Sequence, residues 1–228
     1  MKDIQPTSLI DKVNNQINKN KTVVIGFLVL VLVGIGGYSI YSTYNHKYEE
    51  KAQSAFFDAE RLHAANQVAA QPTKNQTAKD TPPTNVDTKQ VEEKLTSIII
   101  EFPKSRASVQ ASILFADILL QKKDSAKAIG VLEKEFSNYS GHLLDSMLAL
   151  KLSGVYEQNS QCDKALPVLD KIYKSKVSEL KPEALLRTAL CEETLGQTDK
   201  AKQSYQKLAT EFSDTSQGQQ AQKFLKIL

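Results

Sequence analysis

Residue types that could perform catalysis are scattered along this chain. The three histidines, His46, His63 and His142, are far apart, and none has a partner at the spacing of a metal site. Adjacent carboxylates such as Glu192 and Glu193 point to different faces of a helix, so they indicate solvated charge. No phosphate-binding, zinc-protease, serine-hydrolase or dinucleotide-binding motif occurs in the sequence. The sequence therefore predicts neither an enzyme nor a bound cofactor or metal ion.

Cys162 and Cys191 are the only two cysteines, and their chemistry depends on how the chain folds. Cys162 is expected in the turn of one helical hairpin and Cys191 in the first helix of the next, so stacked hairpins could bring them together. In an oxidising compartment a disulfide could then close a loop of about 30 residues and contribute about 3 kcal/mol of stability. The alternative is a pair of buried thiols that behave as small apolar side chains.

An apolar segment near the start, residues 22–41, contains no charged side chain. About 20 helical residues at 1.5 Å each span about 30 Å, the thickness of the hydrocarbon core of a bilayer. The segment is longer than the core of a signal peptide and no small-residue cleavage site follows it, so we expect a retained transmembrane helix, with a cleaved signal as the alternative. Lysines, including Lys19 and Lys21, precede the span, which predicts that residues 1–21 stay in the cytoplasm.

Charge and composition limit the classes of protein to which the rest of the chain can belong. The protein carries 29 Lys and Arg against 26 Asp and Glu, and four of the lysines and two of the aspartates precede the span. The part beyond the membrane is therefore close to neutral, which argues against a nucleic-acid binder that relies on a basic surface. Glycine and proline are sparse, whereas Ala, Leu, Lys, Gln and Glu are plentiful, a composition that favours helices.

Three segments are expected beyond the span. Residues 45–67 have apolar side chains at three- and four-residue intervals and should form a membrane-proximal helix. Residues 68–88 contain three prolines among polar residues and are expected to form a flexible linker or loop. Residues 89–228 are helical and repetitive.

The repeat is marked by three alanines, Ala128, Ala165 and Ala201, which are separated by 37 and 36 residues. Another small residue lies twelve positions before each alanine and a large residue four positions after it; these are Ala116, Ser153 and Ala189, and Leu132, Leu169 and Tyr205. Small residues allow two antiparallel helices to approach closely where they cross, and the large residue fills the space beside the crossing. This period and pattern resemble the tetratricopeptide repeat. The predicted fold is all-α: a single N-terminal transmembrane helix followed by a tetratricopeptide-like helical-hairpin solenoid.

The three copies differ at their turns. The third copy has Gly196 in its turn, whereas the first two have Lys122 and Ser160 nearby. Pro167 lies inside the second helix of copy two, where a kink is expected.

The ends of the array are expected to be irregular. A half-repeat over residues 91–105 should pack at its start, and a helix over residues 217–228 should cap its end, because stacked repeats need polar caps.

A concave surface lined by the first helix of each repeat is the expected protein-binding site. The inward positions lie three before, one after and four after the small residue of each first helix. These candidate protein-binding residues are Ile113, Asp117, Leu120, Leu150, Gly154, Glu157, Leu186, Leu190 and Glu193. Aliphatic residues mixed with acids would suit an extended or helical peptide with apolar side chains and some positive charge. The alternative is that the apolar members belong to the core and the chain's own helices fill the groove.

The whole layout resembles the ancillary SecYEG translocon subunit family (YfgM-like). The resemblance rests on Asn20-Lys21 before the span, the tyrosine-rich exit ending at Tyr44, Ser54-Ala55-Phe56-Phe57 in the first outer helix, and the repeat alanines. It implies an inner-membrane protein with a periplasmic C-terminal domain that acts as a translocon subunit or chaperone. The implied partners are the Sec translocon, a periplasmic chaperone such as PpiD, and unfolded exported proteins.

Two other functions stay open. The C-terminal sequence ATEFSDTSQGQQAQKFLKIL resembles the Tol-Pal-associated repeat proteins that coordinate envelope constriction during division. A purely structural scaffold of the cell envelope is the third possibility.

Overall fold

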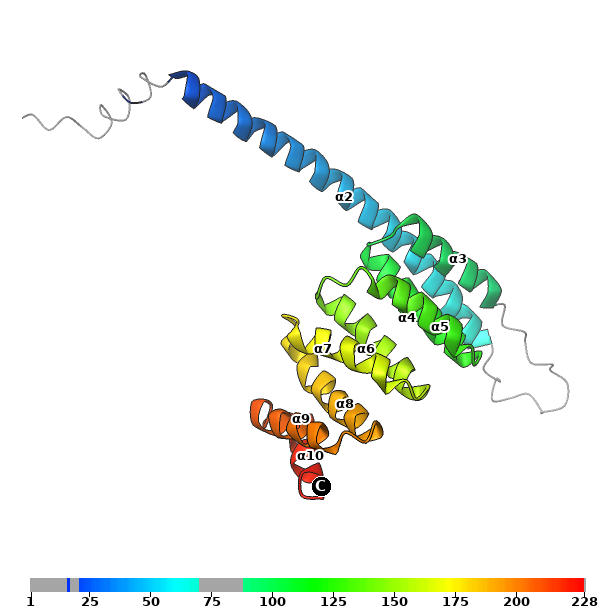
Figure 1. The fold of residues 1–228 in the computed structure, drawn as a ribbon. Helices are drawn as coiled ribbons and strands as arrows, with labels where there is room; N and C mark the ends of the chain where they lie inside the picture. Colours follow the sequence, from blue (N-terminus) through cyan, green and yellow to red (C-terminus); the bar gives the residue numbers. More distant parts are fainter. Residues whose placement is uncertain (1–15, 17–20, 70–87, 228) are drawn as a thin grey trace, which may run out of the picture. The chain divides into compact units, whose positions relative to one another are not determined.

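The computed structural model describes residue 16 and residues 21–69 and 88–227. The cytoplasmic segment predicted over residues 1–21 lies almost wholly outside the described residues, and so does most of the linker predicted over residues 68–88. The chain divides into two compact units, residues 1–48 and 49–228, and each is described by itself. Within the described ranges all regular structure is helical, as predicted (Figure 1).

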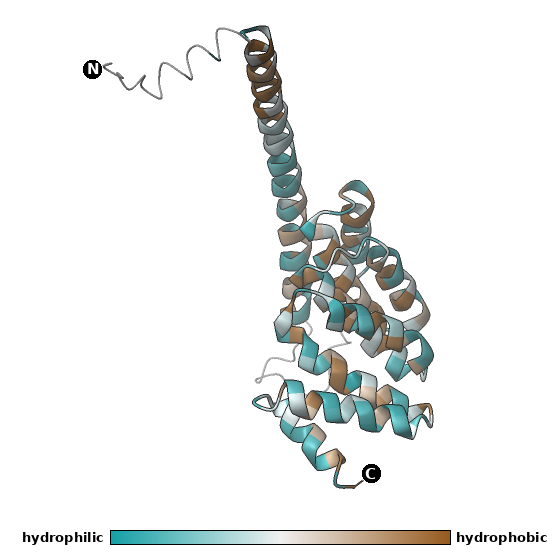
Figure 2. Ribbon diagram, turned by 60° about the vertical axis from the view of Figure 1, so that its left-hand side comes forward, coloured by the Kyte–Doolittle hydropathy of each residue, from teal (hydrophilic) through white to brown (hydrophobic). Residues whose placement is uncertain are grey.

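The first unit is represented by the N-terminal part of one helix, α2 (Lys21–Ala69). Its apolar side chains are exposed on every side; Phe27, Leu30 and Val33 have 66%, 71% and 67% of their surface exposed. Figure 2 shows an apolar stretch near the start of α2, which gives way to more polar residues further along the helix. A helix that is apolar all round is typical of a membrane span, and α2 is long and apolar enough to cross a membrane.

The same helix continues without a break into the second unit. The two helices expected over residues 22–41 and 45–67 are therefore parts of α2. No glycine or proline separates them, and the hydroxyl of Thr43 donates to the carbonyl of Ser39 at 2.9 Å, which satisfies this polar group inside the helix.

The C-terminal part of α2 packs into the core of the second unit. Ala52, Phe56 and Ala59 are spaced as one helical face, and all three are buried. Beside this face, the side-chain amide of Gln53 donates to the side-chain oxygen of Gln110 at 3.1 Å.

Eight further α-helices follow in the described part of the second unit, each packed against the next along the chain (Figure 1). They are α3 (Thr88–Glu101), α4 (Arg106–Gln121), α5 (Ser125–Phe136), α6 (Leu143–Gln158), α7 (Cys162–Lys174), α8 (Lys181–Thr194), α9 (Thr198–Glu211) and α10 (Ser216–Phe224), with a short 3-10 turn, η1 (Ser178–Leu180), before α8. The pairs α4–α5, α6–α7 and α8–α9 are the three predicted repeats.

Two of the expected boundaries need adjustment. The half-repeat before the first copy is α3, which ends two residues before Pro103, because a proline disfavours helix at the residue that precedes it. The C-terminal cap is α10, which ends at Phe224, earlier than predicted. Pro167 lies inside α7 without ending it, since the helix runs on to Lys174; a kink there stays a prediction.

The small and large positions of the repeat form the centre of the core, as the sequence pattern predicted. All nine have no exposed surface: Ala116, Ser153 and Ala189 on the first helices, and Ala128, Leu132, Ala165, Leu169, Ala201 and Tyr205 on the second helices. Small residues are therefore retained where helices of a pair meet, and the repeat period reflects packing.

The turn inside each hairpin has the same backbone geometry in all three copies. Lys123, Ser160 and Gly196 occupy the equivalent position with φ of 63°, 57° and 70°. The amide of Gly196 donates to the carbonyl of Glu193 at 2.9 Å, and the next amide, that of Gln197, donates to Glu192 at 2.8 Å; the other two turns repeat both bonds. This is the Schellman motif, whose left-handed residue is best supplied by glycine. The first copy uses Lys123 there, one residue after the position expected from the sequence.

Two substitutions at the left-handed turn position should change the stability of the second unit in opposite directions. Ser160→Gly is expected to stabilise the second unit by about 1 kcal/mol, because glycine adopts positive φ without a Cβ clash, and Gly196→Ser should destabilise it by a similar amount. A Cβ at residue 196 would meet no atom within 4 Å, so the effect of the serine there comes from the backbone alone. Urea unfolding followed by circular dichroism measures both changes. Equal shifts of the same sign would contradict the prediction.

Candidate functional site

An open groove of about 520 Å³ lies between the first helices of the three repeats. Helix α4 contributes Ile113 and Leu120, and helix α6 contributes Met147, Leu150 and Gly154. Four of these five residues were predicted to face inward, and the structure brings them together here. The lining is mostly apolar, and Met147 keeps 49% of its surface exposed.

A second hollow, of about 660 Å³, adjoins the first where both are lined by Met147. It continues along the N-terminal turn of α6, where Leu143 is 54% exposed, and reaches Val109 on α4. Leu143 and Met147 are one turn apart on the same face of α6. The two hollows share only Met147 in their linings, and we call the first of them the α6 groove.

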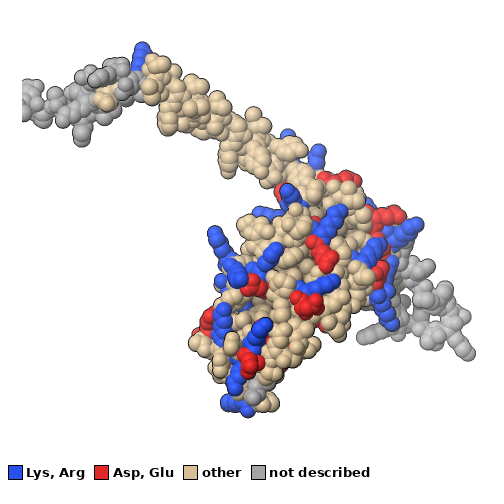
Figure 3. Space-filling model, viewed as in Figure 1, with Lys and Arg blue, Asp and Glu red and all other residues tan. Residues whose placement is uncertain are grey.

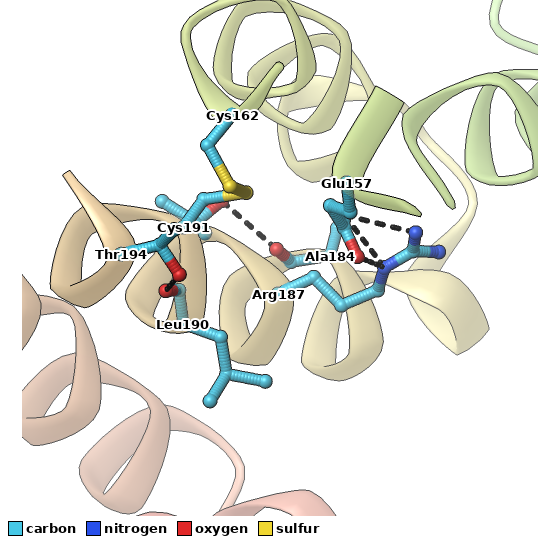
Figure 4. Close-up of a disulfide and its surroundings, with 8 residues drawn as sticks. Glu157, Cys162, Ala184, Arg187, Leu190, Cys191 and Thr194 are labelled. Carbon is cyan, nitrogen blue, oxygen red and sulfur yellow. Dashed lines mark hydrogen bonds and ion pairs between the residues drawn. A yellow bond between two sulfur atoms is a disulfide. The ribbon is translucent and has the colours of Figure 1, made fainter. Parts of the chain in front are cut away.

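The two basic residues that line the α6 groove, Lys151 and Arg187, are paired with Asp117 and Glu157, which were predicted to face inward but are not part of the lining. Asp117 on α4 forms an ion pair with Lys151 on α6. Glu157 on α6 forms an ion pair with Arg187 on α8, in which Nη2 lies 2.9 Å from Oε1 and Nε donates to both carboxylate oxygens at 3.0 and 3.1 Å (Figure 4). Each pair contributes one positive and one negative charge, so these four residues add no net charge to the groove.

Arg187 is the better anchored of the two basic residues. Its Nη1 donates to the backbone carbonyl of Leu150 at 2.9 Å, and only 14% of its side chain is exposed. Burial raises the pKa of Glu157, and the hydrogen bonds and charge of Arg187 act against this rise. A Cβ at residue 154 would lie 2.8 Å from Nη2 of Arg187, so Gly154 leaves the space in which the guanidinium lies against α6.

The candidates from the third copy do not line this groove. Leu186 is buried with 6% of its surface exposed, and the carboxylate of Glu193 accepts a hydrogen bond from the hydroxyl of Tyr205 at 2.9 Å. Leu190 is 37% exposed but lies outside the lining, and in Figure 4 its side chain leaves α8 in a different direction from that of Arg187. Copy three reaches the groove through Arg187 instead.

Sequence reasoning missed Met147, Lys151 and Arg187. A usable signal existed for the last two, because both lie two positions before the small residue of a first helix and both are basic. Met147 had no comparable signal, since a methionine on a helix is an ordinary core residue.

The two cysteines lie at the contact between the second and third repeats. Cys162 is the first residue of α7 and Cys191 lies in α8; their Cα atoms are 5.1 Å apart and their sulfurs are joined in a disulfide (Figure 4). Both side chains are buried. Arg187 is one turn before Cys191 on α8, so the contact that holds Cys191 against α7 also positions Arg187 beside the groove.

Charged residues elsewhere on the second unit are intermixed. On the face shown in Figure 3, Lys and Arg alternate with Asp and Glu and form no block of one sign. In the described ranges, no group of three or more His, Cys, Asp or Glu is placed to hold a metal ion.

Comparison with known proteins agrees with this architecture. The family profile described as a tetratricopeptide repeat-like domain matches residues 17–227. The chain belongs to this family. A tetratricopeptide repeat-like fold is typically a non-catalytic scaffold suited to protein–protein interaction.

Two crystal structures have a fold similar to that of this chain. Both are of a putative kinesin light chain from Podosopora anserina with nearly identical TPR-like repeats, one of them carrying a substitution. Each is 14% identical to this chain, covers 78% of it and 84% of its own length, and gives a TM-score of 0.52. This similarity shows the fold alone. No curated protein matches the chain.

Proposed function

We propose that this chain is a membrane-anchored scaffold of the bacterial envelope that holds a segment of a partner protein in the α6 groove. The observation that carries the proposal is the groove itself, a hollow beside α6 in which large apolar side chains such as Met147 remain exposed to solvent. Exposed apolar surface in a concave site favours the binding of another chain, since its burial releases about 25 cal/mol per Å².

Within this role, the partner we propose is the Sec translocon together with newly exported proteins. The support is the layout: one apolar helix at the N-terminus, lysines before it, and a repeat domain after it. With this topology the repeat domain would lie in the periplasm, where exported chains expose apolar segments before they fold.

Photo-crosslinking in living cells tests both levels of the proposal. A photoreactive amino acid would replace Met147 or Leu150 in the groove, and Leu190 would serve as the control, because it is exposed on α8 but lies outside the lining. We expect adducts from the two groove positions and at least tenfold fewer from Leu190.

The identity of the adducts separates the possible roles. Translocon subunits and many exported proteins would support the proposed function. A single envelope partner associated with cell division would replace it with the Tol-Pal-type role. Equal yields from all three positions would show that the groove is not the binding surface.

A further inference from the structure

The second hollow, of about 660 Å³, is lined by charges of both signs, and we call it the charged hollow. The turn before α4, the turn before α6 with the first residues of that helix, and one residue of α2 form its walls. Its titratable residues are Glu49, Lys104, Arg106, His142 and Asp145. With the histidine neutral, the lining therefore has two positive and two negative charges and no net charge.

Both carboxylates of the charged hollow are held by the backbone. The amide of Arg106 donates to Oε2 of Glu49 at 3.2 Å. The amide of Ser140 donates to Oδ2 of Asp145 at 3.2 Å, and the hydroxyl of the same serine donates to the same oxygen. Within the described part of the chain, Oε1 of Glu49 and Oδ1 of Asp145 accept no hydrogen bond. Each carboxylate is therefore fixed in position with one oxygen free for a ligand.

The two basic side chains of the charged hollow lack an acidic partner. Among the residues that the structure describes, neither Lys104 nor Arg106 forms an ion pair, although two carboxylates line the same hollow. Both residues are exposed. They differ in this from Lys151 and Arg187 of the α6 groove, which are both paired. Positive and negative charges are thus available to a ligand at separate points of one hollow.

Apolar side chains complete the lining and point to an amphiphilic ligand. Leu143 and Met147 keep 54% and 49% of their surface exposed at the edge of the charged hollow. A ligand with one phosphate and one ammonium group would match both kinds of charge, and its methylene groups would cover the two apolar side chains. A simple anion would gain less, because the two carboxylates would repel it.

The chain keeps the charged hollow close to lipid when the apolar segment spans a membrane. Glu49 lies eight residues after Tyr41, the last residue of that segment, and both belong to α2. Eight helical residues extend about 12 Å, so Glu49 lies no further than this from Tyr41. The headgroup layer of a bilayer fills about 5–8 Å beyond the hydrocarbon core. The long side chains of Lys104 and Arg106 can bridge what remains.

We propose that the charged hollow binds the headgroup of an ethanolamine phospholipid from the membrane that anchors the chain. The phosphate would lie against Lys104 and Arg106, and the ammonium group would donate to Glu49 and Asp145. An ethanolamine ammonium has N–H donors for the free carboxylate oxygens, whereas choline has none. This inference rests on the membrane anchorage in the proposed function and is independent of the partner held in the α6 groove.

Photo-crosslinking to lipid tests the site with the full chain in nanodiscs. A photoreactive amino acid replaces Leu143, and the nanodiscs contain equal amounts of phosphatidylethanolamine and phosphatidylglycerol. Mass spectrometry of the intact protein measures the adducts of each lipid. We expect at least fivefold more adducts with phosphatidylethanolamine than with phosphatidylglycerol. With phosphatidylcholine in its place, the excess over phosphatidylglycerol should fall below twofold.

Two changes test the charges of the hollow. Glu49→Gln keeps an oxygen for the amide of Arg106 but removes the negative charge, so it should abolish the preference for phosphatidylethanolamine. Lys104→Gln/Arg106→Gln should lower the yield of lipid adducts at least fivefold. The matched control is Lys200→Gln/Lys202→Gln, because both lysines are exposed on α9 outside the lining; it should change the yield less than twofold.

The contrary results are distinct. An excess of phosphatidylglycerol adducts would show that the hollow selects anions, and equal amounts of both adducts would show contact with lipid without recognition; either overturns the proposed site. A yield that ignores Lys104→Gln/Arg106→Gln would also overturn it. If crosslinks to protein form from Leu150 in cells but no lipid adduct forms from Leu143, the lipid site is ruled out and the proposed function stands. If the chain does not insert into nanodiscs, the membrane anchorage fails and the lipid site fails with it.

Discussion

Replacing Tyr205 by alanine is expected to destabilise the C-terminal end of the repeat array by about 3–5 kcal/mol. Tyr205 on α9 is fully buried and is the largest such side chain in the described part of the protein. Its ring packs against Phe224 of α10 at 5.1 Å between centroids, and its hydroxyl donates to Glu193 of α8 at 2.9 Å. Truncation would therefore remove the packing that joins three helices and leave a cavity between them.

The loss should be local. The core around Tyr205 is a separate cluster that includes Leu186, Leu208 and Ala221, whereas the first two repeats share a larger one. In a repeat protein each unit is stabilised mainly by its neighbours, so the end of the array can open by itself. Hydrogen exchange followed by mass spectrometry should show strong loss of protection in α9 and α10 and little change in α4 to α6.

Tyr205→Phe is the control for this change. It keeps the ring contact with Phe224 and removes the hydroxyl, so it should cost only about 1 kcal/mol. Equal effects of the two substitutions would show that the bond to Glu193, and not ring packing, stabilises this end. Uniform loss of protection over all helices would show that the array unfolds as one unit.

Removing the disulfide between Cys162 and Cys191 should lower stability by about 3–4 kcal/mol, the entropic value for a loop of this length. The bonded residues are 29 positions apart and connect α7 to α8. The double variant Cys162→Ala/Cys191→Ala and the reduced protein should both unfold at lower denaturant concentration than the oxidised protein. Urea unfolding of the full chain in detergent, with and without reductant, measures the difference.

The double variant also supplies the internal control for the reductant. Since it has no thiol, reductant should not shift its unfolding midpoint. The prediction would be contradicted by free cysteines in protein purified from the cell envelope. It would also be contradicted if reductant did not shift the unfolding midpoint of the wild-type protein. Such a result would favour the alternative that the two residues serve as small buried apolar side chains.

The disulfide and the groove are coupled through α8. Cys191 and Arg187 are one turn apart on this helix, and Arg187 holds Glu157 and the carbonyl of Leu150 on α6. Loosening α8 from α7 would therefore also weaken the wall that α8 provides for the groove. Photo-crosslinking from Met147 in the double cysteine variant would detect this as a lower yield of adducts.

The sequence by itself determined the class of the fold and the packing positions of the repeat. An apolar segment of about 20 residues has few structural alternatives, and small residues at a constant period mark where helices of a pair approach closely. These signals are local, because a helix face is defined by spacings of three and four residues. For this reason the spacing of Ala128, Ala165 and Ala201 alone was enough to predict their place in the core, where all three are fully buried.

The turns show where a local signal was insufficient. A glycine such as Gly196 predicts a left-handed residue in the turn. Lys123 and Ser160 adopt the same left-handed conformation although neither is a glycine. Hydrogen bonds from each turn to the preceding helix, together with the packing of both helices, hold these residues at positive φ at a cost in stability.

Only the tertiary structure decided which candidate residues form the groove. Leu150 and Leu186 are equivalent in the repeat, yet Leu150 lines the groove and Leu186 is buried. Likewise the ion pair between Glu157 and Arg187 joins residues 30 positions apart on different helices. The periodicity of one helix defines the face that it buries. Whether a residue at the edge of that face is exposed depends on how the neighbouring repeat is rotated against it. That rotation is set by side chains that are distant in the sequence.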